Sequence, residues 1–193
     1  GRALVQGLLE FARPDGRPAA INLADVTANF LPVLHTAIGV NYDLQFERPA
    51  TLGQVLIDKT QFTRVLLNLG INARDSMPQG GPIRIRIAPV QTCETIGPTS
   101  NFVLVEVADR GLGMDEATRL RIFEPFFTTK AKGTGLGMPI VRRVVDRAGG
   151  FLRIESEPGA GTRVQAYFPR VGGSSGGTTE FTIPPELLEQ RNS

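Results

Sequence analysis

The chain has 193 residues, 41% of them hydrophobic, which is enough to bury the core of one medium-sized domain. Its 21 lysines and arginines against 19 aspartates and glutamates give a formal charge of only +2, which argues against a nucleic-acid-binding protein. One cysteine and one histidine exclude a disulfide framework and a zinc site of the usual spacing, so a reducing compartment is expected. No apolar run approaches the roughly 20 residues of a membrane-spanning helix, and the N-terminus lacks a signal-peptide pattern. We therefore expect a cytoplasmic piece without membrane contact of its own, whether or not a longer parent is membrane-anchored.

The first third of the chain is predicted to begin with two helices. Residues 4–11 have the apolar spacing of a helix, and residues 15–20 are expected to form a loop. Asn22 has the position and the side chain of a helix cap, and the apolar residues after it keep a helical period to Ile38. Because Pro32 lacks the N–H that a helix interior needs, we expect a kink or a break there.

Two strands and the longest helix are predicted next. Apolar and polar residues alternate over residues 40–47, which predicts a half-buried strand, and residues 54–58 predict a second, short one. Asp58 is expected to cap a helix over residues 59–77, which Pro78 and a Gly-Gly turn bring to an end.

The middle of the chain predicts a pair of strands. Isoleucine alternates with arginine over residues 82–90, so the arginines are expected to face solvent. Residues 101–109 are rich in valine and predict a central strand. The loop between them, residues 91–101, is a plausible hairpin connection, and it carries the single Cys93 with no partner.

The last third predicts two helices and a hairpin. A short helix is expected over residues 115–123 and a longer one over residues 137–150, whose proline falls in the first turn, where it is tolerated. Residues 151–156 and 162–169 are expected to be strands joined by the turn "EPGAG". Residues 171–193 are expected to form a flexible tail or linker, because glycines and serines follow from residue 172.

Polar residues recur on one face of the predicted helix 59–77. Asn68, Asn72 and Asp75 stand at i, i+4 and i+7 and therefore share a face, while apolar residues cover much of the rest. Two asparagines alone are compatible with a solvated face. Asparagine is, however, a poor helix former, so two of them one turn apart in a helix interior have a cost that a binding site would justify.

Two glycine-rich motifs follow this helix in the sequence and are also candidates for a binding site. In "DRGLGM", Asp109 can accept a hydrogen bond from an exocyclic amine, while Gly111 and Gly113 let the backbone approach a flat ring. In "GTGLGM", residues 133–138, three glycines lead into a helix N-terminus, whose free N–H groups suit phosphate oxygens. A P-loop would need Lys-Ser or Lys-Thr after its last glycine, and a dinucleotide fingerprint would need a strand just before it, so both are disfavoured.

The order of these motifs carries a resemblance. An asparagine-bearing helix, "DRGLG", "IFEPFFTTK", "GTGLGM" and a terminal "EPGAGT" hairpin follow one another, and residues 20–170 resemble the catalytic and ATP-binding domain of sensor histidine kinases. This domain belongs to a wider ATPase group with DNA gyrase, Hsp90 and MutL. The resemblance implies an α+β fold, a two-layer α/β sandwich known as the Bergerat fold, with a mixed sheet of five or more strands packed on about three helices.

The resemblance also implies a role for each motif. Asn72 matches the asparagine that coordinates Mg²⁺ bridging the triphosphate of ATP, and Asn68 matches its partner one turn earlier. Asp109 matches the aspartate that hydrogen-bonds the adenine amine, and Thr162 matches a threonine beside that aspartate. Asn68, Asn72 and Lys130 are the implied catalytic residues. The implied nucleotide site comprises Asn68, Asn72, Asp75, Asp109, Gly111, Gly113, Met114, Phe123, Thr128, Thr129, Lys130, Lys132, Gly133, Thr134, Gly135, Leu136, Gly137, Met138 and Thr162.

The stretch "IFEPFFTTKAKGTGLGM" divides into parts under this resemblance. Its aromatic residues are expected to anchor it, and residues 128–134 are expected to be an ATP lid, disordered or dependent on nucleotide for its conformation. Lys130 and Lys132 could both reach the terminal phosphates. For Lys132, simple solvation of the loop is as good an explanation as a phosphate contact. Many family members have a lysine at the position of Asp75, so the phosphate contacts at that position stay open.

The resemblance favours a kinase over an ATPase. In the hydrolysing relatives a glutamate that activates water stands at the position of Asn68, and an amide cannot accept that proton. His35, the only histidine, is followed by Thr36-Ala37 where the family's phosphoacceptor is usually followed by an acidic residue, so we interpret it as structural. The acceptor is then expected on a separate domain that consists of a two-helix hairpin. Residues 1–13 resemble the end of the second helix of that hairpin.

The implied organisation is therefore residues 1–13 from that hairpin, residues 14–170 as the catalytic domain and residues 171–193 as the tail. The implied partners are an adenine nucleotide, the hairpin domain and, indirectly, a receiver domain or response regulator, with a monomeric fragment and a homodimeric parent. Two alternatives stay open: a non-catalytic nucleotide-binding scaffold, and a serine kinase of the anti-sigma type with the same fold.

Overall fold

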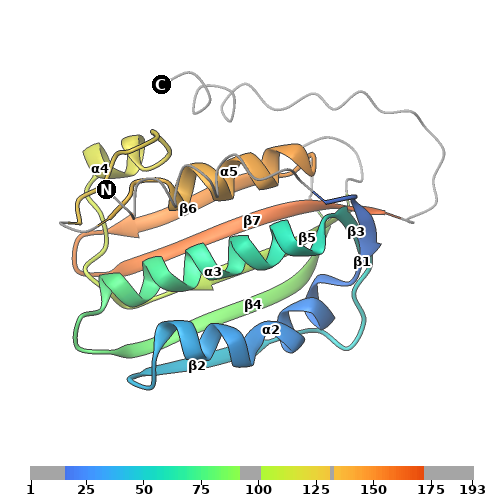
Figure 1. The fold of residues 1–193 in the computed structure, drawn as a ribbon, viewed down its shortest axis with the longest axis horizontal. Helices are drawn as coiled ribbons and strands as arrows, with labels where there is room; N and C mark the ends of the chain where they lie inside the picture. The colour runs from blue at the N-terminus through green and yellow to red at the C-terminus, as the bar shows by residue number, and fades with distance from the viewer. Residues whose placement is uncertain (1–15, 92–100, 131–132, 172–193) are drawn as a thin grey trace.

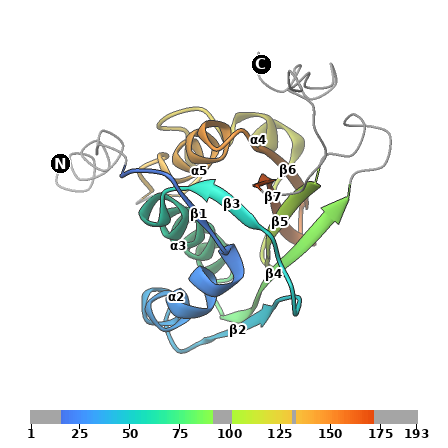
Figure 2. The ribbon, with the colours of Figure 1, turned by 90° about the vertical axis from the view of Figure 1, so that its right-hand side faces the viewer.

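The computed structural model describes residues 16–91, 101–130 and 133–171. A mixed sheet of seven strands forms one layer, and three helices on one of its faces form the other (Figures 1 and 2). The three helices are α2 (Leu23–Ile38), α3 (Lys59–Ser76) and α5 (Gly137–Arg147), with α3 in the middle, and a short fourth helix is α4 (Glu116–Arg121). This arrangement confirms the expected two-layer α/β sandwich.

The strand order brings distant segments of the chain together. Strands β1, β3, β7, β5, β4 and β2 follow one another across the sheet, and β6 pairs with β7. Only β2 and β4 are parallel among the paired strands described. Their bounds are β1 (Ala19–Ile21), β2 (Tyr42–Glu47), β3 (Gln54–Ile57), β4 (Gly81–Gln91), β5 (Asn101–Ala108), β6 (Phe151–Glu157) and β7 (Gly161–Val171). Because Ala108 pairs with Arg163, the loop that leaves β5 starts beside the β6–β7 turn.

The core lies between the helices and the sheet. Alternate residues of the central strands, such as Ile85, Val105 and Phe168, are buried against the helices. From α3, the fully buried Phe62 meets the ring of Phe168 edge to face, with 6.1 Å between the ring centroids. Burial of the apolar face of α3 therefore fixes the direction in which its polar face points.

Most predicted elements are confirmed, including the helix caps. The side chain of Asn22 accepts hydrogen bonds from the N–H groups of Ala24 and Asp25 at the start of α2. The carboxylate of Asp58 accepts one from the N–H of Gln61 at the start of α3. Each of these bonds satisfies a donor that the first turn of a helix leaves free.

One prediction was wrong, and another was wrong in part. The segment 15–20 was expected to be a loop, but it runs into β1, which pairs antiparallel with β3. A kink or a break was expected at Pro32, and the break is excluded, since helix α2 continues through this residue. Pro32 is exposed, so its ring does not disturb the packing, while Leu34 and Ile38 of the following turns are buried in the core and hold the helix in place.

Several predictions lie outside the described residues. They are the helix over residues 4–11, the position of Cys93, the role of Lys132 and the tail from residue 172. Val171, the first residue of the expected tail, still belongs to β7. None of the helices in the described part of the chain combines the length and the apolar character that crossing a bilayer requires.

We predict that Phe62→Ala lowers the free energy of unfolding by about 3 to 5 kcal/mol, because it removes a fully buried ring from the contact between α3 and β7. The matched control is Phe126→Ala, the same change at a side chain that is 53% exposed, which should alter it by less than about 1 kcal/mol. Urea unfolding of both variants checks this, and equal losses would contradict the assigned core.

Candidate functional site

Helix α3 presents a polar stripe to the start of α5. Asn68 and Asn72 are half-buried on this stripe. A side-chain carbon added to Gly137, the first residue of α5, would lie 3.2 Å from Asn68 Oδ1 and 3.8 Å from Asn72 Nδ2. The amide nitrogen of Asn68 donates to the carbonyl of Arg64 at 2.9 Å, which leaves its Oδ1 on the side of Gly137. The two asparagines and the N-terminus of α5 therefore form one small polar region.

Asp109 lies at the other end of the stripe, where the chain leaves β5. Its Oδ1 accepts hydrogen bonds from the backbone N–H of Gly111 at 2.8 Å and from the hydroxyl of Ser76 at 3.0 Å. The Ser76 hydroxyl shares its one proton with the Ala73 carbonyl, at 2.7 Å. Burial raises the pKa of Asp109 above its ordinary value, and the bonds from Gly111, Ser76 and the backbone near Thr162 only partly offset this rise. The carboxylate is thus held in a fixed orientation by two donors.

The backbone after Asp109 is packed too closely for side chains. Gly113 has a φ of +66°, and a side-chain carbon there would overlap the carbonyl of Glu157. Gly111 is buried, and a side-chain carbon there would overlap the hydroxyl of Ser76. The Leu112 N–H donates to the Ser76 carbonyl at 3.0 Å, so this loop is attached to the end of α3.

Thr162 lies beside Asp109, as predicted. The backbone N–H of Asp109 donates to the Thr162 carbonyl at 2.9 Å. The Thr162 hydroxyl is 2.9 Å from that of Ser156, which also accepts from the N–H of Met114 at 3.0 Å. The β6–β7 hairpin therefore holds both ends of the loop that contains Asp109.

Phe123 and Phe127 are half-buried, in agreement with the expectation that the aromatics of "IFEPFF" anchor this segment. Phe123 packs on the core with the Arg142 guanidinium 5.2 Å from its ring centroid. The expectation was wrong for Phe126, which is exposed and has a φ of +68°. Its N–H donates to the Gly135 carbonyl at 3.0 Å, and the Phe126 backbone leaves no room for a side chain at Gly135. This close crossing, rather than burial of the ring, ties residue 126 to the start of α5.

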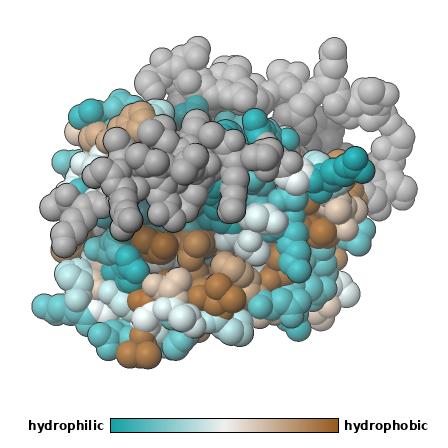
Figure 3. Space-filling view, in the orientation of Figure 1, coloured by the Kyte–Doolittle hydropathy of each residue, from teal (hydrophilic) through white to brown (hydrophobic). Residues whose placement is uncertain are grey.

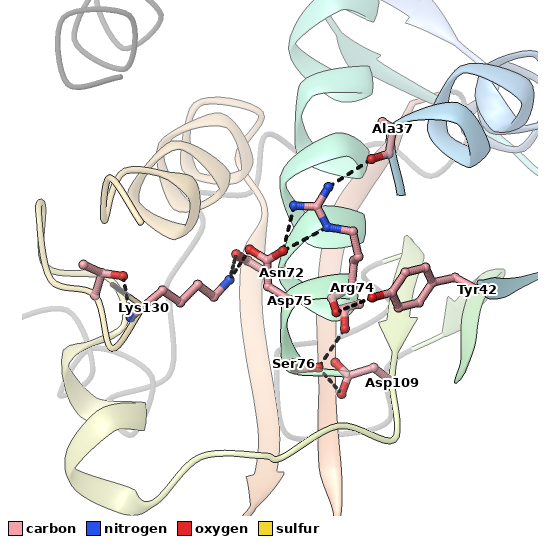
Figure 4. A network of polar contacts seen from close by, with 10 residues as sticks. Ala37, Tyr42, Asn72, Arg74, Asp75, Ser76, Asp109 and Lys130 are labelled. Carbon is pink, nitrogen blue, oxygen red and sulfur yellow. Dashed lines mark hydrogen bonds and ion pairs between the residues drawn. The ribbon is translucent and has the colours of Figure 1, made fainter. Parts of the chain in front are cut away.

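Lys130 reaches α3, as Figure 4 shows. Its Nζ donates to Asn72 Oδ1 at 3.1 Å and to Asp75 Oδ2 at 3.0 Å. The other oxygen of Asp75 accepts from Nε and Nη2 of Arg74 at 2.9 and 2.7 Å. Partial burial opposes ionisation of Asp75, but the hydrogen bonds and charges of Lys130 and Arg74 outweigh it and lower the pKa of Asp75.

The other predicted residues that the structure describes flank the start of α5 or follow β5. Leu136 and Met138 are buried at the start of α5, which has no side-chain cap. Gly133 donates its N–H to the Lys130 carbonyl at 3.2 Å, and Thr128 Oγ1 accepts from the Lys130 N–H at 3.1 Å. Thr129 is exposed, and Met114 and Thr134 are half-buried.

Ser76 and Ser156 were not predicted. Ser76 orients the Asp109 carboxylate, and Ser156 joins Thr162 to Met114. A signal for Ser76 was present, because it follows Asn72 by four residues and so extends the spacing of Asn68 and Asn72 by one more turn. No local signal marks Ser156, whose role depends on pairing between two strands.

Comparisons with known proteins identify the family. Residues 57–172 match the model of the histidine kinase-, DNA gyrase B- and HSP90-like ATPases, and the chain belongs to this family. It is 37% identical over 178 residues to the sensor kinase CckA of Brucella abortus (strain 2308), which covers 88% of this chain but 19% of that protein. It is 31% identical over 170 residues to sporulation kinase D of Bacillus subtilis (strain 168), covering 86% of this chain and 32% of that protein. The chain thus spans about a third or less of these relatives.

The structural comparison agrees. The catalytic domain of the histidine kinase ThkA superposes with a TM-score of 0.61 at 28% identity, covering 80% of this chain and 97% of that domain. The fold and the family are therefore those of the ATP-binding catalytic domains of histidine kinases.

We predict that Asp109→Asn is at least as stable as the unaltered chain at pH 7. Since the pKa of Asp109 is raised in the folded state, ionisation is costly there, and this cost disappears below the ordinary value of 3.8, where both states are protonated. The amide can still accept from Gly111 and Ser76. Thermal unfolding between pH 7 and pH 4 should show the advantage of the variant shrinking as the pH falls.

The control for this comparison is Asp25→Asn, which removes the carboxylate of an exposed ion pair with Arg48. It should change the melting temperature little at any pH. A marked loss of stability for Asp109→Asn at pH 7 would contradict the assigned environment of Asp109.

Proposed function

We propose that this chain is the catalytic domain of a sensor histidine kinase, which transfers the γ-phosphoryl group of Mg-ATP to a histidine on a separate helical-hairpin domain. The observation that carries the proposal is the polar stripe of α3. Toward one end of the stripe Ser76 orients the carboxylate of Asp109. One turn away Asn72, whose Oδ1 contacts the Lys130 ammonium group, lies near the N-terminus of α5. A nucleotide has a base and a charged triphosphate at opposite ends, which suits this arrangement.

The Asp109 end would bind adenine. A carboxylate accepts a hydrogen bond from the exocyclic amine, and the two oriented donors keep it in place without moving when the base binds. Gly111 and Gly113 allow the loop after Asp109 to pack closely on Ser76 and on the Glu157 carbonyl, which holds the backbone of the proposed adenine site in place.

The Asn72 end would bind the phosphates and Mg²⁺. Asn72 Oδ1 contacts one cation, the Lys130 ammonium group, which supports a fit to a hard cation that prefers oxygen ligands. In the described part of the chain no group of three or more His, Cys, Asp or Glu side chains could hold a metal, so the phosphates would supply further ligands. Bound Mg²⁺ would neutralise charge on the phosphates, while Lys130 and the free N–H groups of α5 would orient them.

The acceptor would come from outside this domain. His35 is exposed on α2, and α3 lies between α2 and α5 in Figure 1. His35 is thus on the far side of α3 from the proposed phosphate site. The Asn68 amide cannot take a proton from water, whereas a neutral imidazole has its own lone pair and needs less activation. We therefore infer transfer to histidine rather than hydrolysis, with a response regulator as the later recipient, in the cytoplasm, where ATP is available.

The test mixes the chain with the purified hairpin domain of the parent kinase and labelled ATP. We expect phosphate on the hairpin that is labile in acid and stable in base. Asn72→Ala should lower the rate by about 100-fold or more. Asn29→Ala, the same change at an exposed position of α2, should leave the rate unchanged. Measurable Mg-ATP binding without any transfer would contradict the kinase and favour the non-catalytic scaffold.

A further inference from the structure

Two oxygens on successive turns of α3 converge on one ammonium group. Lys130 Nζ lies 3.1 Å from Asn72 Oδ1 and 3.0 Å from Asp75 Oδ2, and the side chains of Lys130 and Asp75 are 37% and 28% exposed (Figure 4). Asn72 and Asp75 are three residues apart and therefore share a face of the helix. The same amide oxygen that would bind Mg²⁺ is thus bound by a lysine.

The Asp75 carboxylate is held in place from the opposite side. Two nitrogens of Arg74 bond its Oδ1, and Nη1 of Arg74 donates to the Ala37 carbonyl at 3.0 Å, near the end of α2. The Tyr42 hydroxyl shares its one proton between the carbonyls of Arg74 and Met77, at 3.2 and 3.0 Å, and so contacts the last turn of α3. Asp75 is therefore a preoriented acceptor, unlike the flexible partner of an ordinary surface ion pair.

Lys130 is oriented from its own side as well. Its backbone N–H donates to Thr128 Oγ1, and the segment begins at the crossing of Phe126 and Gly135. These two contacts hold the backbone near Lys130 in a position from which its ammonium group reaches Asn72.

Lys130 and Mg²⁺ would compete for Asn72. A Mg²⁺ ion on Asn72 Oδ1 would be repelled by the Lys130 ammonium group, which contacts the same oxygen at 3.1 Å. Movement of Lys130 away from Asn72 would free the amide oxygen and deliver the ammonium group to the phosphates.

We propose that Asp75 is a positioning residue that holds the Lys130 ammonium group on Asn72, so that nucleotide-bound Mg²⁺ must displace Lys130 to bind there. This inference rests on the proposed function for the identity of the competing cation. The hold of Asp75 on Lys130 does not depend on that function and is tested separately.

The first experiment measures acylation of lysine amines by acetic anhydride without nucleotide, with mass spectrometry resolving each site. The exposed Lys59 is the internal reference. In the unaltered chain Lys130 should react several-fold more slowly than Lys59, and Asp75→Asn should remove most of that difference. Asp75→Glu should preserve part of it, and Asp25→Asn should preserve all of it. Unchanged protection of Lys130 in Asp75→Asn would overturn the proposal.

The second experiment measures Mg-ADP affinity by calorimetry in a double-mutant cycle. Asp75→Asn should tighten binding several-fold when Lys130 is present and have little effect in the Lys130→Met background. If Asp75→Asn tightens binding equally in both backgrounds, Asp75 acts only by repelling the negative charge of the nucleotide. If Asp75→Asn weakens binding, Asp75 is a metal ligand. Either result overturns the proposed competition between Lys130 and Mg²⁺. Absence of Mg-ADP binding by the unaltered chain would instead refute the proposed function, and the acylation result would still decide whether Asp75 holds Lys130.

Discussion

The packing of α3 between the sheet and its neighbouring helices is the constraint on which the rest of the molecule depends. Phe62 is buried against Phe168 of β7, and this contact fixes both the depth and the rotation of the helix. With that face buried, the opposite stripe from Asn68 to Ser76 has one available direction, toward α5 and the loop that follows β5. A helix that could rotate would separate the two ends of the proposed nucleotide site.

The hydrogen bonds around this stripe give Asp109 and Asp75 different chemical environments. Ser76 and a backbone N–H orient Asp109, and burial raises the pKa of this carboxyl group despite these two donors. Asp75, next to Ser76 in α3, has a lowered pKa because the hydrogen bonds and charges of Lys130 and Arg74 outweigh its partial burial. Two carboxylates near the end of one helix thus differ in their environments, which suits one to a neutral donor and the other to a cation.

Much of the fold could be predicted because its signals are local. Side-chain periodicity and caps such as Asn22 and Asp58 depend on neighbouring residues, and they located the main helices. Strand β1 could not be predicted in this way, since three residues become a strand only by pairing with β3. The motifs likewise located Asn72 and Asp109, but the bond from Lys130 to Asp75 joins residues 55 positions apart and appears only once the chain is folded.

The central claim is that Asp109 recognises the amine of adenine while α3 carries the phosphate end of the site. Comparing ADP with inosine diphosphate by calorimetry, both with Mg²⁺, tests it most directly, because inosine replaces the amine with a carbonyl oxygen and leaves the diphosphate unchanged. Two acceptors would then face each other at Asp109. We predict that inosine diphosphate binds about 10- to 100-fold more weakly than ADP. Equal affinity for the two nucleotides would contradict this assignment of the site.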